Sequence, residues 1–179
     1  MSNYSHSIKN QNNPSFIIQS LSEQDFATIA ELESKLQPTD AWTVQDLNEL
    51  WANRAATGFG GLGIFVASDD TVVNAAANTT AKLTAYLLYQ VLDVAEILRV
   101  GTDKAYQSQR LAYRLLSAWL AELSVDCLLE VRADNQAAIA LYHKLDFKTI
   151  HVRRGYYKNI DSTRTDAWVM QKQYSSPKS

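Results

Sequence analysis

The chain has few of the residues that build disulfide frameworks and metal sites. Its 179 residues include one cysteine, three histidines and three prolines. Cys127 on its own cannot form an internal disulfide, and its apolar neighbours indicate a buried, inert thiol of the kind found in reducing compartments. Because the histidines have no metal-ligand spacing with one another or with Cys127, we expect no bound metal.

An excess of charge of one sign and long apolar runs are also lacking. The 17 Lys and Arg residues nearly balance the 19 Asp and Glu residues, so the molecule has no overall field that would attract nucleic acid or a membrane surface. Residues 1–15 lack the apolar segment of a secretory signal, and no later run has the length of a membrane span. We therefore expect a cytoplasmic protein whose partners include neither nucleic acid nor membrane.

The residues that are present suffice for one folded domain. Hydrophobic residues make up 46% of the chain, which is enough to build a core at this length. We expect a single domain over residues 16–174, a flexible N-terminal tail over 1–15 and a C-terminal tail over 175–179.

Hydrophobic periodicity predicts strands and helices in the order β-α-α-β-β-β-α-β-α-β-β. This order is typical of an α/β domain with one mixed sheet and helices on its faces. Strands are expected at 16–18, 64–67, 83–91, 95–100, 128–131, 147–152 and 168–171. We expect residues 58–63 to close the second helical segment, and residues 68–82 and 153–166 to form long loops.

Helix starts are marked by residues that can cap backbone N–H groups. Ser22 and Thr43 each precede an acidic residue three positions later, as in a capping box, and Asp134 or Asn135 caps a later helix. The first helix has Glu33 in the same stripe as apolar residues at helical spacing.

Glu130 lies inside an otherwise apolar strand. An unpaired carboxylate in such a strand is costly. Glu130 therefore points to a polar edge, forms a salt bridge with Arg132 or Arg99 as candidates, or has a catalytic role. The residues alone favour the polar edge or the salt bridge over the catalytic role.

Residues 95–123 combine a strand, a polar turn and an amphipathic helix. The N-terminus of such a helix presents unpaired N–H groups and the positive end of the helix dipole, which suits a phosphate group. An ordinary strand-to-helix connection that binds nothing has the same pattern, so this pattern favours neither interpretation.

Three stretches resemble a known family. Residues 96–112, EILRVGTDKAYQSQRLA, are similar to the fourth strand and pyrophosphate loop of the GNAT superfamily of N-acetyltransferases. Residues 129–147, LEVRADNQAAIALYHKLDF, are very similar to the family pattern LEVRxxNxxAxxLYxxxGF. Residues 153–157, RRGYY, with Asp166 and Ala167, resemble the end of RimI-type members, which acetylate protein N-termini.

The resemblance implies a GNAT fold, which is a mixed, mostly antiparallel sheet with helices on both faces. Its fourth and fifth strands, here 95–100 and 128–131, would splay apart and admit acetyl-CoA as the acetyl donor. The implied acetyl-CoA contacts are Leu98, Val100, Gly101, Thr102, Ser108, Gln109, Arg110, Leu111, Ala112, Tyr113 and Asn135.

Acetyl transfer from a thioester to an amine needs a base for the amine and a proton for the leaving thiolate. The resemblance implies Glu130 as the base and Tyr142 as the acid, with Trp42, Tyr156 and Tyr157 along the acceptor groove. A peptide α-amine is roughly a tenth neutral at pH 7, whereas lysine is below about a thousandth neutral. A single base therefore favours a protein N-terminus as acceptor, and RimI-type members imply that of a ribosomal protein.

Two residues depart from the family pattern. Arg110 stands at the first glycine of the pyrophosphate loop, where a left-handed backbone would cost roughly 1–2 kcal/mol. Its guanidinium could instead donate hydrogen bonds to the phosphates. Asp146 replaces a glycine at a helix end, where Asp can adopt the left-handed cap.

Two other functions stay open at this point. An enzyme of the same fold could acetylate a small-molecule amine, and a domain that has lost acetyl-CoA through Arg110 could act as a binding module. The sequence does not predict the oligomeric state.

Overall fold

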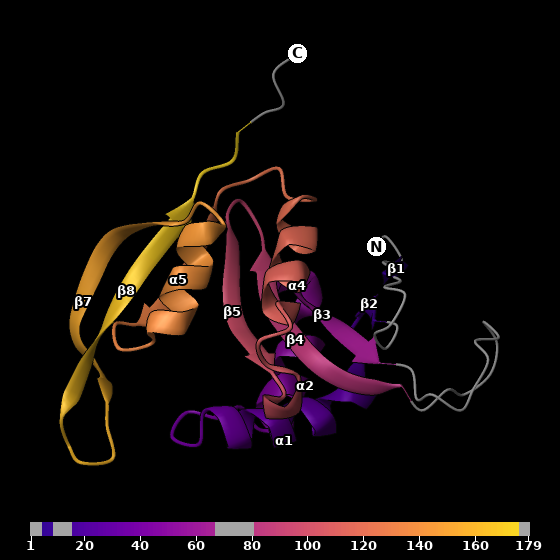
Figure 1. Ribbon diagram of the computed structural model, residues 1–179, viewed down its shortest axis with the longest axis horizontal. Helices are drawn as coiled ribbons and strands as arrows, with labels where there is room; N and C mark the ends of the chain where they lie inside the picture. Colours follow the sequence, from indigo (N-terminus) through magenta and orange to yellow (C-terminus); the bar gives the residue numbers. More distant parts are fainter. Residues whose placement is uncertain (1–4, 9–15, 67–80, 176–179) are drawn as a thin grey trace.

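The computed structural model describes residues 5–8, 16–66 and 81–175, which form one sheet with helices on both faces (Figure 1). The strands are β1 (Ser5–Ile8), β2 (Phe16–Ser20), β3 (Phe59–Val66), β4 (Lys82–Val91), β5 (Ala95–Thr102), β6 (Cys127–Arg132), β7 (Lys148–Lys158) and β8 (Arg164–Lys172). The helices are α1 (Phe26–Leu36), α2 (Val44–Ala52), α3 (Arg54–Thr57), α4 (Leu111–Leu120) and α5 (Gln136–Lys144), with short 3-10 turns at Glu23–Asp25 and Lys104–Tyr106. The strand order is β1-β2-β3-β4-β5-β6-β8-β7.

One parallel pair stands among antiparallel neighbours in this sheet. β5 pairs with β6 in parallel, and only through Ala95 with Cys127, Glu96 with Leu128, and Ile97 with Leu129. β5 nevertheless continues to residue 102 and β6 to residue 132. The two strands therefore separate beyond Ile97, which confirms the predicted splay.

A β-bulge lies where the strands separate. On its other edge β5 pairs with β4 through Arg99 opposite Leu88 and Ile97 opposite Tyr89, so Leu98 is left as the extra residue. A bulge of this kind bends its strand and changes which face the following side chains take. Arg99 therefore lies on the same face as Leu88, which belongs to the core beneath α1 and α2.

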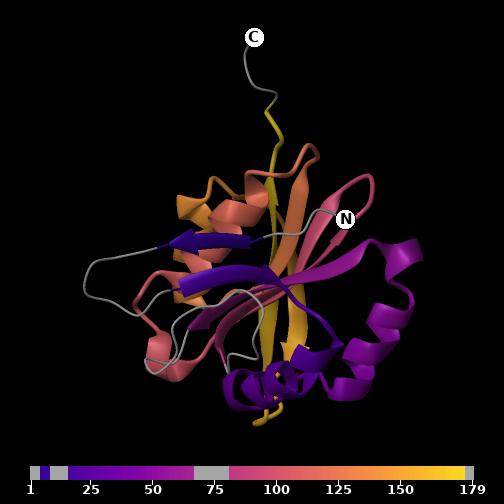
Figure 2. The same ribbon diagram turned by 90° about the vertical axis from the view of Figure 1, so that its right-hand side faces the viewer.

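Each face of the sheet has its own core. The core beneath α4 and α5 includes Leu115, Leu116, Trp119, Leu129, Val131, Ile139 and Phe147. The core beneath α1 and α2 includes Phe26, Ile29, Leu47, Phe65, Tyr86 and Leu88. Figure 2 shows the sheet between these two layers, with the orange helices on one side and the indigo to violet helices on the other. The predicted α/β fold with helices on both faces is confirmed.

The predicted caps are also confirmed. Ser22 and Thr43 each form a capping box, at the 3-10 turn before α1 and at the start of α2 respectively. Asn135, rather than Asp134, caps α5 by accepting a hydrogen bond from the N–H of Ala138. Asp146 has a φ of 67° just after α5, the left-handed conformation expected where the family has glycine.

The predicted loops differ from the structure in two places. Residues 59–66 form β3, although the glycine-rich stretch 58–63 was expected to close a helical segment. A Cβ on Gly60 would lie 2.8 Å from the Tyr89 ring, and one on Gly63 would lie 2.6 Å from Leu83. These glycines thus let neighbouring side chains lie directly on a strand. Gly58 alone ends a helix, with a φ of 65°.

The second difference is that residues 153–166 belong mostly to a hairpin. β7 runs to residue 158 and β8 starts at residue 164, with a register shift between Arg153 and Tyr157 around Gly155. These residues are mostly polar and lack an apolar alternation, so periodicity did not predict the strands. Backbone pairing extends the strands instead. Most of the loop predicted at 68–82, together with Ala67, lies outside the described residues.

The N-terminal tail prediction is wrong for residues 5–8. They form β1, which pairs antiparallel with β2 from Ser5 opposite Gln19 to Ile8 opposite Phe16. An edge strand needs only a neighbour with free backbone groups, so the polar sequence SHSI gave no strand signal.

Candidate active site

The separation of β5 from β6 leaves one edge of β5 without a strand partner. Leu98, Val100, Gly101 and Thr102 lie in this part of β5. The last three pair with β4 on the opposite edge, and Leu98 is the bulge residue. We call the space between residues 98–102 of β5 and residues 130–132 of β6 the slot. Backbone N–H and C=O groups at its edge suit a ligand that carries amides, because such groups need hydrogen-bond partners.

The turn before α4 has a strained backbone. Ser108 has a φ of 64° and Arg110 a φ of 60°, both left-handed. The turn therefore does require this conformation where Arg110 replaces glycine, at a cost of roughly 1–2 kcal/mol. Arg110 and Gln109 are exposed, and α4 starts directly after them. The predicted phosphate contacts thus surround a helix N-terminus, where N–H groups lack intrahelical partners.

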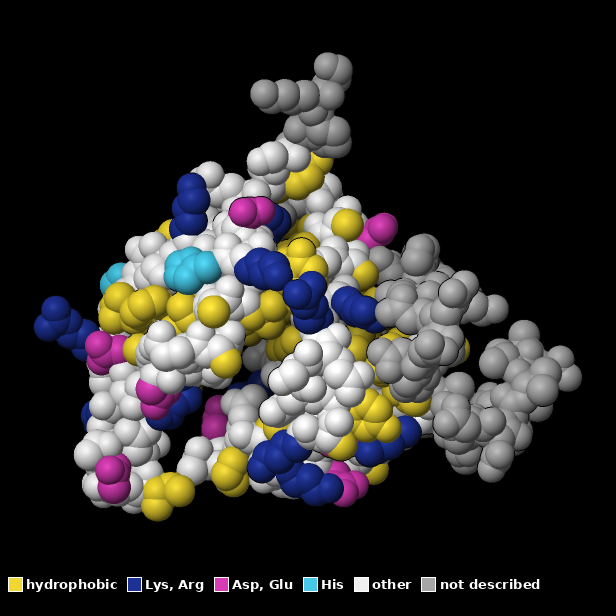
Figure 3. All heavy atoms as spheres, in the orientation of Figure 1, with side chains coloured by type: hydrophobic (Ala, Val, Ile, Leu, Met, Phe, Trp, Pro, Cys, Tyr) yellow, Lys and Arg dark blue, Asp and Glu magenta, His cyan; other side chains and the backbone are white. Residues whose placement is uncertain are grey.

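Positive charge lies beside the first turn of α4. Leu111 is buried, while Ala112 and Tyr113 are partly buried. The ammonium of Lys144 lies 5.0 Å from the centre of the Tyr113 ring. Figure 3 shows Lys and Arg side chains gathered over α4, which suits an anionic group at this helix end.

Glu130 faces the side of β6 away from α5. Its neighbours Leu129 and Val131 are buried beneath α5, and strand alternation puts Glu130 on the opposite face with 29% of its side chain exposed. The Arg153 guanidinium donates a hydrogen bond to Oε1 of Glu130 at 2.5 Å. The predicted partners Arg132 and Arg99 are therefore wrong, because the folding of β7 beside β8 brings Arg153 to Glu130.

Tyr142 lies on the other face of β6. It is 7% exposed within the core beneath α5, and its ring packs edge-on against Phe147 with centroids 5.8 Å apart. Burial raises the pKa of the Tyr142 phenol, and the neighbouring Tyr157 and Cys127 add to the rise. The phenol therefore keeps its proton at neutral pH.

The three predicted acceptor residues come from two segments that contact the strands of the slot, and we call these segments its walls. The Trp42 ring centre lies 4.8 Å from the Arg99 guanidinium of β5, and the Tyr157 ring centre lies 5.1 Å from that of Arg132 of β6. Trp42 belongs to residues 37–43, which we call the α1–α2 connection, and Tyr156 and Tyr157 belong to β7. Burial raises the pKa of Tyr157, the charges of Glu130 and Asp40 raise it further, and Arg99 lowers it. Figure 3 shows the surface hollowed beside the β7–β8 side, with charged side chains on the walls.

The rings of the hairpin wall are held together. Tyr156 and Tyr157 pack edge-on with centroids 5.0 Å apart, and the Arg153 guanidinium lies 3.8 Å from the Tyr156 ring centre. Because Arg153 also binds Glu130, one side chain connects the candidate base to the candidate acceptor wall.

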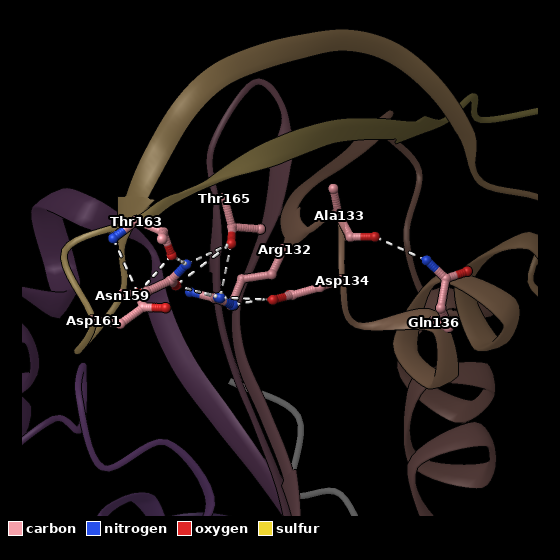
Figure 4. Close-up of polar contacts among 8 residues, drawn as sticks. All are labelled: Arg132, Ala133, Asp134, Gln136, Asn159, Asp161, Thr163 and Thr165. Carbon is pink, nitrogen blue, oxygen red and sulfur yellow. Dashed lines mark hydrogen bonds and ion pairs between the residues drawn. The ribbon is translucent and has the colours of Figure 1, made fainter.

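Arg132 ties the hairpin to the turn after β6 (Figure 4). Its guanidinium donates to both carboxylate oxygens of Asp134, at 3.0 and 2.7 Å, and to Asn159 at 2.8 Å and Thr165 at 3.2 Å. The Tyr157 ring lies 5.1 Å from the same guanidinium. The hairpin is therefore fixed to the turn that carries Asn135, the residue expected to hold acetyl-CoA.

Sequence reasoning gave no place in the site to Glu33, Tyr86 or Glu96, and it named Arg99 only as a candidate partner of Glu130. Glu33, Tyr86 and Arg99 form a buried cluster between α1 and the sheet. Burial raises the pKa of Glu96, and the charge of Glu130 raises it further. The one sequence signal was Glu33, an acid within the apolar stripe of the first helix.

Two further properties concern only residues 5–8, 16–66 and 81–175. Nowhere among them do three or more His, Cys, Asp or Glu side chains gather as metal ligands would. Their helices are too short or too polar to cross a bilayer.

The chain is similar to acetyltransferases. Residues 26–147 match the acetyltransferase (GNAT) family. Ribosomal protein bS18-alanine N-acetyltransferase of Salmonella typhimurium is 33% identical over 145 residues, which span 76% of this chain and 93% of that protein. The relative of the same name from Escherichia coli strain K12 is 42% identical over 94 residues, which span 50% of this chain and only 63% of that relative's length.

Solved structures agree on the fold. The crystal structure of the ribosomal-protein-S18-alanine N-acetyltransferase from Escherichia coli has a TM-score of 0.71 at 28% identity, covering 91% of this chain and 96% of that one. Arabidopsis thaliana NAA60 in complex with a bisubstrate analogue has a TM-score of 0.70 at 15% identity, covering 90% and 99%. The second likeness concerns the fold alone.

Replacing Arg132 with Gln should lower the free energy of unfolding at neutral pH. It should also make that free energy depend less on pH in the acid range. The hydrogen bond from Arg132 lowers the pKa of Asp134. A carboxyl whose pKa is lowered in the folded state stabilises the fold at pH values above its unfolded-state pKa. This contribution is lost as the pH falls below about 4. We expect Arg132→Gln to lower the free energy of urea unfolding by about 1 kcal/mol at pH 7.

The difference between Arg132→Gln and the wild type should shrink as the pH is lowered towards the folded-state pKa of Asp134. Lys158→Gln, an exposed change on the same hairpin, is the control and should leave stability unchanged. A difference for Arg132→Gln that is the same at acid and neutral pH would contradict the Asp134 linkage.

Proposed function

The chain belongs to the acetyltransferase (GNAT) family, and from that premise we propose that it transfers the acetyl group of acetyl-CoA to a protein N-terminal α-amine. The similarity to bS18-alanine N-acetyltransferases supports the N-terminus of a ribosomal protein as the acceptor. Such an acceptor locates the reaction in the cytoplasm. The observation that carries the proposal is a slot beside β6 with Glu130 on one face of that strand and Tyr142 on the other.

The slot and the α4 turn fit acetyl-CoA. The unpaired edge of β5 at Leu98, Val100 and Thr102 suits the amide-bearing pantetheine arm. The absent side chain of Gly101 makes room for the Tyr86 ring, because a Cβ there would lie 2.3 Å from that ring. The N–H groups at the start of α4 and the Arg110 guanidinium suit the pyrophosphate. Asn135 uses its side-chain oxygen to cap α5, which leaves its side-chain N–H groups to donate hydrogen bonds to acetyl-CoA.

Glu130 is the proposed general base. Among the described residues, its carboxylate accepts its hydrogen bond from Arg153 at Oε1, which leaves Oε2 to take the proton of the attacking amine, directly or through water. The neutral amine then forms a bond to the thioester carbonyl carbon. Trp42, Tyr156 and Tyr157 line the side of the slot from which the acceptor approaches.

Tyr142 is the proposed general acid. As the carbon–sulfur bond breaks, the electron pair stays on sulfur, and the Tyr142 phenol gives that thiolate a proton. The new amide nitrogen loses its remaining extra proton, which returns to the Tyr142 phenolate through water. The raised pKa keeps the phenol protonated until then. Since base and acid lie on opposite faces of β6, amine and sulfur can occupy opposite sides of the same reacting carbon.

A binding module is the second candidate function, because Arg110 holds a left-handed conformation where a glycine would be unstrained. Titration calorimetry with acetyl-CoA separates the two candidates. Micromolar binding, followed by mass-spectrometric detection of acetylated N-terminal peptide, supports the enzyme. Binding that is absent or millimolar would remove it. Polyamines assayed beside the peptides test a small-molecule acceptor.

Glu130→Gln should lower kcat about a hundredfold at pH 7, because an amide cannot accept the amine proton. The amide oxygen can still accept the hydrogen bond from Arg153, so we expect the Kd for acetyl-CoA to change less than about twofold. Glu122→Gln, an exposed change after α4, should leave kcat unaltered. Unchanged turnover of Glu130→Gln across the pH range would exclude Glu130 as the base.

Tyr142→Phe should slow the chemical step about tenfold or more at saturating substrates, because the thiolate loses its proton donor. The ring contact with Phe147 is kept, so thermal unfolding should stay close to the wild type. Single-turnover quench measurements isolate this step. An unaltered single-turnover rate would show that another group protonates the sulfur.

A further inference from the structure

A fully buried carboxylate lies between α1 and the sheet. Glu33 has an exposed fraction of 0%. Its Oε1 accepts a short hydrogen bond from the Tyr86 hydroxyl of β4, and its Oε2 accepts one from the backbone N–H of Trp42 at 3.4 Å. The Arg99 Nε of β5 lies 3.8 Å from the same Oε2. Glu33 therefore joins two strands to the end of the α1–α2 connection.

Arg99 holds the rest of that connection. Its guanidinium donates to Oε1 of Gln37 at 3.2 Å, and to both the carbonyl and the carboxylate of Asp40 at 2.9 Å. It also lies 4.8 Å from the centre of the Trp42 ring. One side chain thus contacts the start, the middle and the end of residues 37–43.

The environment of Arg99 indicates that it fixes the α1–α2 connection and does not only stabilise the fold. Its side chain is 13% exposed, and its Nε–H is a buried donor without a hydrogen-bond partner among the described residues. A buried unpaired donor costs roughly 1–3 kcal/mol. The guanidinium directs its hydrogen bonds to Gln37 and Asp40 and leaves Nε–H unsatisfied. A buried unsatisfied group calls for an explanation, and here the explanation is that the guanidinium is oriented to hold the connection.

Arg99 also joins the two halves of the site. It lies between Leu98 and Val100, whose backbone edge forms the slot, and the bulge at Leu98 aims it at the connection. Movement of the connection relative to β5 would therefore move Trp42 relative to the reacting carbon. Loss of this placement would remove contacts that Trp42 makes with the bound acceptor, which weakens acceptor binding and raises KM while leaving kcat unchanged.

We propose that Arg99, anchored by Glu33, is a positioning residue that sets the Trp42 wall against the slot and so determines how tightly the acceptor binds. This rests on the proposed function. The carboxylates of Glu33 and Asp40 offset the charge of Arg99, so this wall presents no net cation to an incoming ammonium group.

The test uses the full chain with the double change Glu33→Gln and Arg99→Met. It removes the guanidinium without leaving a buried unpaired carboxylate, and the amide oxygen introduced by Glu33→Gln keeps an acceptor for Tyr86. The matched control is Arg54→Met, because Arg54 stacks on Trp51 at 4.5 Å and donates to the Trp51 carbonyl, in α3 away from the slot.

We expect the KM for an N-terminal peptide to rise about tenfold in the double variant, with kcat and the Kd for acetyl-CoA within about twofold of the wild type. Hydrogen exchange of residues 37–43 should quicken. Arg54→Met should change none of these quantities. A folded double variant with unaltered peptide KM, or with equal losses for peptide and acetyl-CoA, overturns the proposal.

If the double variant does not fold, Arg99→Lys gives the same readout, because it keeps a cation beside Glu33 but loses the fork that holds Gln37 and Asp40. If the wild type transfers no acetyl group to peptides, the proposed function fails. Hydrogen exchange still decides on Arg99 in that case, since unchanged exchange over residues 37–43 overturns the positioning role.

Discussion

The early end of the pairing between β5 and β6 is the constraint on which the rest of the site depends. Three paired positions join the strands, and beyond Ile97 the bulge at Leu98 turns β5 away. A backbone edge left open within a sheet must find partners elsewhere. The slot provides that place for a ligand with amides, and the start of α4 lies close by along the chain for its phosphates.

Two arginines hold the walls of this opening in similar ways. Arg132 fixes the β7–β8 hairpin to the turn after β6, and Arg99 fixes the α1–α2 connection to β5. Each pairs with a nearby carboxylate and stacks on an aromatic ring of the wall that it holds. A planar guanidinium suits this task because it can bind a carboxylate with its edge and an aromatic ring with its face.

The site retains several unfavourable features. Residues with a left-handed backbone precede α4, and the carboxylate of Glu33 is buried. The Arg99 Nε–H has no hydrogen-bond partner among the described residues. Strain and buried charge of this kind concentrate at functional sites, where the surrounding packing maintains them. The two cores on either face of the sheet supply that packing.

The sequence by itself determined the element order and the helix caps, because periodicity and capping are local. Through its resemblance to the family at 129–147, the sequence also implied the splayed strands and the candidate site residues, and the roles of those residues stay predictions. It did not determine β1, the strand through the 58–63 glycines or the long hairpin, since backbone pairing extends those strands regardless of side-chain pattern. Only the tertiary structure decided that Arg153 binds Glu130 and that Arg99 faces α1. Those contacts depend on strand order and on a one-residue bulge, and neither leaves a mark in residue spacing.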